Sequence, residues 1–193
     1  MLIEPQAGEN LRAALETGLR TFMPGRDAAT DQFAKTARGI RVFTIPLRDV
    51  VDGGGLVNAD PAGWRFLAIV ENEGALAVDV VNPAGGGTAV ASLSRHKLIA
   101  AAIANWEKLR NSELARTEDL ELRILRIPAM LTEAFWLRAG DGREFIVPYL
   151  VPDPALEVMR PYTREDFIAA ARPIAKSFLL ADDGDRVDTA QQQ

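Results

Sequence analysis

The sequence predicts an α+β fold, with an antiparallel sheet of about six or seven strands and amphipathic helices packed on one face. Three observations predict this class. Short segments alternate in the manner of half-buried strands, longer segments repeat apolar residues at helical spacing, and turns rich in glycine or proline separate them. The chain has 193 residues, of which 48% are hydrophobic and 25% charged, enough for one sizeable core. We therefore expect a single domain over residues 1–180.

Helices are expected first, in the segment 9–38. Asn10 is a favoured N-cap residue, and apolar residues recur at helical spacing from there to Phe22. Pro24-Gly25 ends this pattern. A shorter helical pattern, with Phe33 on its apolar side, follows over residues 27–38.

A first run of strands is expected after these helices. Residues 40–51 are predicted to form one strand, broken at Ile45-Pro46, and the later strands of this run are expected at 64–71, 76–82 and 88–93. Ser94 is then expected to cap a helix over residues 95–110, whose apolar stripe includes Trp106. Trp106 is expected to anchor this helix on the sheet.

A second run of strands lies within residues 119–150. The first strand of this run ends at Ile127-Pro128, the second spans 131–138, and a hairpin turn at 139–142 leads to a third over 143–150. Thr163 then begins a capping-box pattern, so a last helix is expected over 163–180.

One short motif occurs in both runs. The residues R-V-F-T-I-P at 41–46 match R-I-L-R-I-P at 123–128, and each run has a tryptophan in its second strand, Trp64 or Trp136. Two interpretations stay open: a duplicated β-meander plus helix unit, or a chance recurrence of apolar strands that end at proline. A duplication would divide the chain into halves, 40–110 and 119–180.

Residues 181–193 form an acidic tail. This stretch holds one arginine and four aspartates, and Val187 is its one large apolar side chain. Ordering it would cost backbone entropy with little burial in return. We expect it to be disordered and dispensable for folding.

Composition excludes several classes of function. The chain has no cysteine, which rules out disulfides, thiolate nucleophiles and Cys-ligated metals. No cofactor motif is present, so no cofactor and no metal are expected. Its net charge of −5 has no clustered basic face, which argues against nucleic acid as a partner. With no signal-like N-terminal run and no apolar window of about 18 residues, we expect a soluble, cytoplasmic protein without a membrane partner.

Few residues are candidates for catalysis. His96 is the only histidine, and it lies at the start of a helix between two cations, where a neutral imidazole is favoured. Glu133 shares the apolar side of its strand, where burial would raise its pKa, although a salt bridge with Arg126 or Arg138 is the commoner outcome. Asp79 is expected to be solvated. No catalytic set is recognised, so we lean against an enzyme.

The sequence therefore favours a non-catalytic role. We expect a protein–protein interaction or assembly protein, such as an adaptor, accessory or chaperone-like subunit, with a protein partner or self-association through an exposed sheet edge or strand face. The alternative is a small-molecule-binding protein or enzyme. Its apolar pocket against the sheet would be lined by Trp64, Phe135 and Trp136, with His96 or Glu133 as the polar group.

Overall fold

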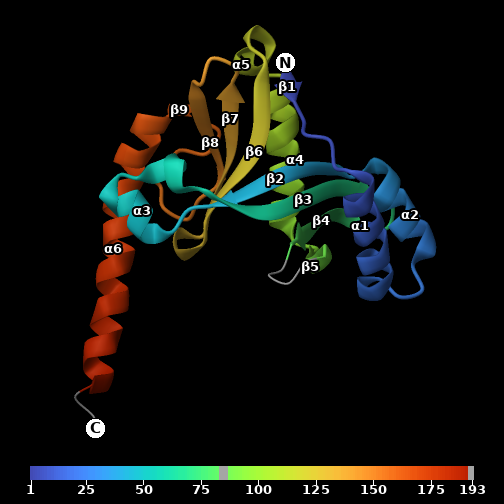
Figure 1. Ribbon diagram of the computed structural model, residues 1–193, viewed down its shortest axis with the longest axis horizontal. Coiled ribbons are helices and arrows are strands. Elements are labelled where there is room, and N and C mark those ends of the chain that lie inside the picture. Colours follow the sequence, from blue (N-terminus) through green and yellow to red (C-terminus); the bar gives the residue numbers. More distant parts are fainter. Residues whose placement is uncertain (83–86, 191–193) are drawn as a thin grey trace.

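One mostly antiparallel sheet of nine strands forms the centre of the molecule (Figure 1). The structure is a computed structural model, and it describes residues 1–82 and 87–190. The strands are β1 (Leu2–Ile3), β2 (Arg38–Thr44), β3 (Asp60–Val70), β4 (Gly74–Val81), β5 (Ala89–Ser94), β6 (Leu120–Ile127), β7 (Thr132–Ala139), β8 (Glu144–Leu150) and β9 (Tyr162–Thr163). They pair in the order β5-β4-β3-β2-β6-β7-β8-β9, and β1 also pairs with β6.

The predicted α+β class is confirmed, with more strands than expected. The helices are α1 (Glu9–Phe22), α2 (Asp27–Thr36), α3 (Leu47–Asp52), α4 (Lys97–Arg110), α5 (Glu113–Thr117) and α6 (Arg164–Ala190), with 3-10 turns η1 (Gly55–Asn58) and η2 (Pro128–Met130). Two of the additional strands, β1 and β9, have only two residues each. Such short strands have no alternation that a sequence pattern could reveal.

The two copies of the repeated motif lie next to each other at the centre of the sheet. β2 and β6 pair in parallel, with Arg41 opposite Arg123 and Val42 opposite Ile124. The matched residues of the two motifs are thus neighbours in space. Elements repeat in the same order on either side, since β2, β3, β4, β5 and α4 are followed by β6, β7, β8, β9 and α6. The sheet is continuous through the β2–β6 pair.

The predicted strand over residues 40–51 is wrong in its second half. β2 ends at Thr44, and α3 begins at Leu47 with Pro46 as its N-cap. Proline cannot donate to a strand ladder but fits the first turn of a helix. The second motif behaves alike, because Pro128 begins η2 directly after β6.

The two long helices lie on opposite faces of the sheet, not on one face as expected. Ile124 and Phe135 pack in the cluster that contains α4, whereas the alternate residues Leu125 and Trp136 pack in the cluster that contains α6. Successive side chains of a strand point to opposite faces. Both faces of β6 and β7 are apolar, so alternation does not decide which face receives which helix.

α1 and α2 cover the other end of the α6 face. Their side chains pack with Phe66, Val78 and Val80 from β3 and β4. In Figure 1, α1 and α2 lie to the right of the sheet and α3 and α6 to the left, whereas α4 passes behind it. The middle of this face, over β2 and β6, lies between these two groups of helices.

The last helix extends further than predicted. Thr163 caps it as expected, since its Oγ1 accepts a hydrogen bond of 3.1 Å from the backbone N–H of Asp166. α6 then continues as helical backbone to Ala190, where disorder from residue 181 was expected, and residues 191–193 lie outside the described part. Over the residues described, no helix is both long and apolar enough to cross a membrane.

Candidate functional site

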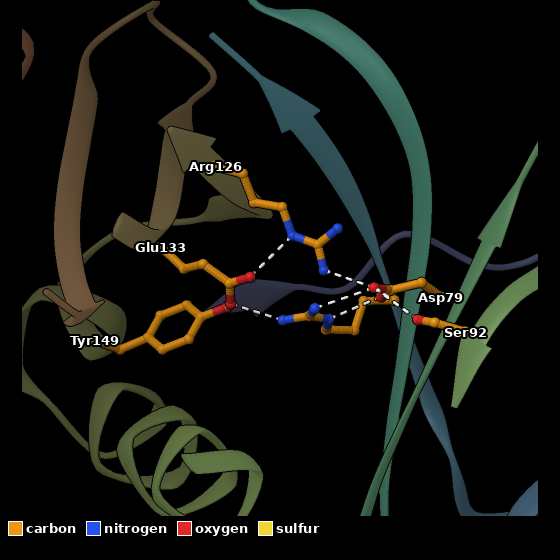
Figure 2. Close-up of polar contacts among 6 residues, drawn as sticks. Asp79, Ser92, Arg126, Glu133 and Tyr149 are labelled. Atoms are coloured by element: carbon orange, nitrogen blue, oxygen red, sulfur yellow. Dashed lines mark hydrogen bonds and ion pairs between the residues drawn. The ribbon is translucent and has the colours of Figure 1, made fainter. Parts of the chain in front are cut away.

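A network of charged side chains lies on the α4 face and joins the two halves of the sheet (Figure 2). Two ion pairs come from residues directly opposite each other on neighbouring strands: Arg65 and Asp79 on β3 and β4, and Arg126 and Glu133 on β6 and β7. In the first, Arg65 Nε lies 2.8 Å from Asp79 Oδ1; in the second, Arg126 Nε lies 2.9 Å from Glu133 Oε1. Each half thus supplies one arginine and one carboxylate.

The pairs also exchange contacts across the β2–β6 boundary. Arg65 Nη1 donates to Glu133 Oε2 over 2.6 Å, and Arg126 Nη2 donates to Asp79 Oδ2 over 2.8 Å. Every member therefore bonds to a partner in its own half and to one in the other half. The side chains are 10 to 21% exposed, so these contacts are shielded from solvent more than surface pairs are.

Two hydroxyl groups complete the network. The Tyr149 hydroxyl donates to Glu133 Oε2 over 2.6 Å, and Ser92 Oγ lies 3.4 Å from Asp79 Oδ2. Burial, together with the charge of Glu133, raises the pKa of Tyr149 well above its usual value. The phenol is therefore a neutral donor at physiological pH.

The electrostatics of the network are balanced. Burial raises the pKa of Asp79, and the positive charge of Arg65 opposes this rise. Burial alone would lower the pKa of Arg65, but its electrostatic interactions with Tyr149, Glu133 and Asp79 raise it instead. Two cations and two anions that satisfy one another leave no free charge to bind a ligand. The arrangement suits the locking of one half of the sheet to the other.

The opposite face carries a different arrangement, which we call the arginine row. Trp64, Arg41, Arg123 and Trp136 are directly opposite one another, in that order, on β3, β2, β6 and β7. The guanidinium carbon of Arg41 lies 5.5 Å from the centre of the Trp64 ring, and that of Arg123 lies 4.9 Å from Trp136. Both distances are typical of cation–π contacts. The two arginines are the first residues of the two motif copies.

Positive charge exceeds negative charge around the arginine row. Glu121 accepts hydrogen bonds from Arg123 over 3.0 and 2.7 Å. This pairing is the main cause that lowers the pKa of Glu121. Arg41 and Arg138 are exposed, and no carboxylate of the described residues lies within 4.0 Å of either. Three arginines thus surround one glutamate on this part of the sheet.

The two ends of the sheet differ in how well they are protected. β9 is two residues long and leads directly into α6. β5 has six residues, Ala-Val-Ala-Ser-Leu-Ser, and no described strand pairs with its outer edge. A groove of about 520 Å³ runs beside it along α1 and is lined by Ala13, Ala14, Thr17, Gly18, Thr21, Phe22, Thr88, Ala89 and Val90.

His96 lies at the start of a helix, as predicted, and its side chain contacts the helix backbone. It is the N-cap of α4, where Ser94 was expected, and its Nδ1 accepts a hydrogen bond of 3.2 Å from the backbone N–H of Leu98. The side chain is exposed. This contact is to the helix backbone and not to a catalytic group, so a catalytic role for His96 stays a prediction.

The prediction of a salt bridge for Glu133 is confirmed, whereas the prediction for Asp79 is wrong. Glu133 forms the expected salt bridge with Arg126. The expectation that Asp79 is solvated is wrong, because its side chain is 17% exposed and bonded to two arginines. Its strand is buried on both faces, so the side with small residues is not the solvent side. Arg65, a lone charge in an apolar strand, was the sequence signal for this partner.

The aromatic residues predicted to line one pocket are divided among separate clusters. Phe135 packs on the α4 face, whereas Trp136 packs under α6 on the other face. Trp64 lies at the margin of the cluster under α1 and α2. These three side chains do not line a common cavity, although the two tryptophans share the arginine row. Arg41, Arg123 and Tyr149 were not singled out from the sequence.

Comparisons with known proteins add no relative. No family model, no curated protein and no solved structure matches this chain. Among the residues at 1–82 and 87–180, no group of three or more histidines or carboxylates is placed to hold a metal ion.

Proposed function

We propose that the chain is a non-catalytic, cytoplasmic interaction protein that takes up an extended segment of a partner protein along the outer edge of β5. The observation that supports this most directly is the unpaired edge of a six-residue terminal strand. An open strand edge offers a row of backbone donors and acceptors, and another strand is the group that satisfies them best.

The composition of β5 supports the same proposal. Proteins usually protect an open edge with a charge, a proline or a very short strand. β9 has the last of these protections, whereas β5 has no charged residue and no proline among its six residues, and its one irregularity is a register shift opposite Asp79 and Val80. An edge kept long and uncharged fits a strand that pairs with another chain.

The groove beside β5 would receive the side chains of the added strand. Small residues of α1, such as Ala13 and Ala14, line one side of the groove, so a backbone can approach closely. Phe22 lies at the same groove and is 46% exposed, which provides an apolar contact for the incoming segment. We infer that the partner segment is extended, with small or apolar side chains at alternate positions.

A photo-crosslinking amino acid at Ala91, an exposed residue of β5, tests this proposal. We expect it to crosslink to one defined segment of a partner or of a second copy, and β5 amides to gain protection from hydrogen exchange in that complex. Ala91→Lys should abolish the complex because a charge is placed at the edge. Ala155→Lys, at an exposed position elsewhere, is the matched control.

The two variants distinguish strand addition at β5 from binding elsewhere on the surface. Loss of the complex in Ala91→Lys but not in Ala155→Lys supports strand addition at β5. A complex that both variants retain, or crosslinks without a preferred segment, would overturn it.

A further inference from the structure

Arg41 of the arginine row is exposed to solvent, and the row lies between two groups of helices. α1 and α2 pack on β3, β4 and β5, and α6 packs on β8 and β9 with α3 against it, so these helices flank the middle of the face (Figure 1). Arg41 and Arg138 are exposed there. A cavity of about 360 Å³, lined in part by Ile3, Glu121 and Arg138, adjoins the row. Both side chains and space are therefore available to a ligand.

We propose that the arginine row binds a carboxylate-rich segment of a partner protein. The geometry of the guanidinium groups supports this class of ligand. A guanidinium that stacks on an aromatic ring uses its flat face, which leaves the N–H groups in its plane free to donate. The Arg41 guanidinium lies over the Trp64 ring, and no carboxylate is found within 4.0 Å of it among the residues whose side chains the structure describes. The fork of an arginine matches the two oxygens of a carboxylate.

The number of arginines without a carboxylate partner limits the number of carboxylates that the ligand can use. Arg123 already engages Glu121, so Arg41 and Arg138 are the cations that a ligand would neutralise. Neighbouring strands lie about 4.8 Å apart, so Arg41 on β2 and Arg138 on β7, on either side of β6, are within reach of one short acidic segment. The half-buried ring of Trp64, beside Arg41, supplies apolar surface for the rest of such a segment.

The surroundings favour an acidic peptide over a nucleic acid. Arg41 and Arg138 are the two cations that a ligand would neutralise, and the chain has a net charge of −5. Binding to a nucleic acid rests on many phosphate contacts along a basic stripe, which two arginines do not provide. A few carboxylates need only a few arginines.

This inference goes beyond the strand addition proposed for β5, because it rests on different strands and on charged side chains. Ala91→Lys should therefore leave binding at the arginine row unchanged. Failure at one surface can be told from failure at the other.

Fluorescence anisotropy with the full chain and a labelled oligoglutamate peptide tests the proposal. We expect binding that weakens as salt is added, and little binding of the matched oligoglutamine peptide. The double variant Arg41→Gln/Arg138→Gln should bind oligoglutamate at least about tenfold more weakly, since a charge-assisted hydrogen bond contributes about 1.5 kcal/mol or more. Both residues are exposed, so the variant should keep the wild-type thermal midpoint.

A charge-matched control separates a site from a general attraction. Arg12→Gln/Arg48→Gln removes two exposed arginines of α1 and α3 and should bind oligoglutamate as the wild type does. Equal weakening in both double variants would overturn the proposal. So would tighter binding of oligothymidylate than of oligoglutamate, or self-association that Arg41→Gln/Arg138→Gln abolishes, which would make this face a contact between two copies.

Discussion

Arg65 on β3 donates a hydrogen bond of 2.6 Å to Glu133 on β7, although the β2–β6 pair separates their strands. The contact spans the boundary between the two halves of the chain. Arg126 makes the reciprocal contact to Asp79 over 2.8 Å. The network is therefore a join between halves that the backbone ladder also connects through β2 and β6.

Glu133→Gln is expected to destabilise the fold. Arg65, Arg126 and Tyr149 all donate to this carboxylate, and the side chain is only 17% exposed. Removing its charge leaves two shielded arginines short of an anion, so the free energy of unfolding should fall by about 2 kcal/mol or more. Urea denaturation measures this change.

Glu157→Gln is the control for that measurement. Glu157 pairs with Arg160, but its side chain is 61% exposed. Exposed pairs contribute about 1 kcal/mol at most. Similar losses in the two variants would contradict a structural role for the network.

Tyr149→Phe should change how stability depends on alkaline pH. A tyrosine in the unfolded chain ionises near pH 10, whereas in the fold burial and Glu133 raise the pKa of Tyr149 well above that value. The stability from this group is fully present below about pH 10 and is lost as the pH rises toward the folded pKa.

The wild type should therefore lose unfolding free energy above about pH 10 more steeply than Tyr149→Phe, which is less stable at neutral pH because it lacks the hydrogen bond to Glu133. Urea denaturation across this pH range measures both slopes. Parallel curves would mean that the hydroxyl is not shielded.

Gly63→Ala is expected to disrupt the close approach of β3 to β4. Gly63 has a φ of 131°, and an added Cβ would lie 2.2 Å from the carbonyl oxygen of Val80. Both the backbone conformation and the close approach exclude a side chain, so a loss of about 2 kcal/mol or more is expected. Thermal unfolding of Gly140→Ala is the comparison, because a Cβ there meets no atom within 4 Å. Equal midpoints for both variants would contradict this close approach.

Truncation after Leu180 should leave the thermal midpoint within a few degrees of the full-length value. The removed residues hold four aspartates and one arginine, and they have little apolar surface to bury. Loss of residues without packing contacts changes stability by about half a kcal/mol. A midpoint that falls much further would show that the end of α6 is docked in the native state.

Much of the fold could be predicted because its signals are local. The helices α4 and α6 follow from apolar residues at helical spacing, and the cap at Thr163 follows from a capping pattern of a few residues. Glu133 could be paired with Arg126 in advance, since the strands that carry them are joined by a short turn. The shared motif also marked the two strands that lie at the centre of the sheet.

The site depended on contacts between residues far apart in the sequence. Alternation shows which residues of a strand share a face, but it does not show which helix covers that face when both sides are apolar. For the same reason the sequence placed Asp79 in solvent and Trp64 in a pocket with Phe135. The sequence by itself determined the long helices, most of the longer strands, the breaks at Pro46 and Pro128, and the residues that share a side of each strand. Only the tertiary structure decided that β2 pairs with β6, because that pairing depends on packing along the whole chain. It is this pairing that sets Arg41 beside Arg123 and brings Arg65 to Glu133.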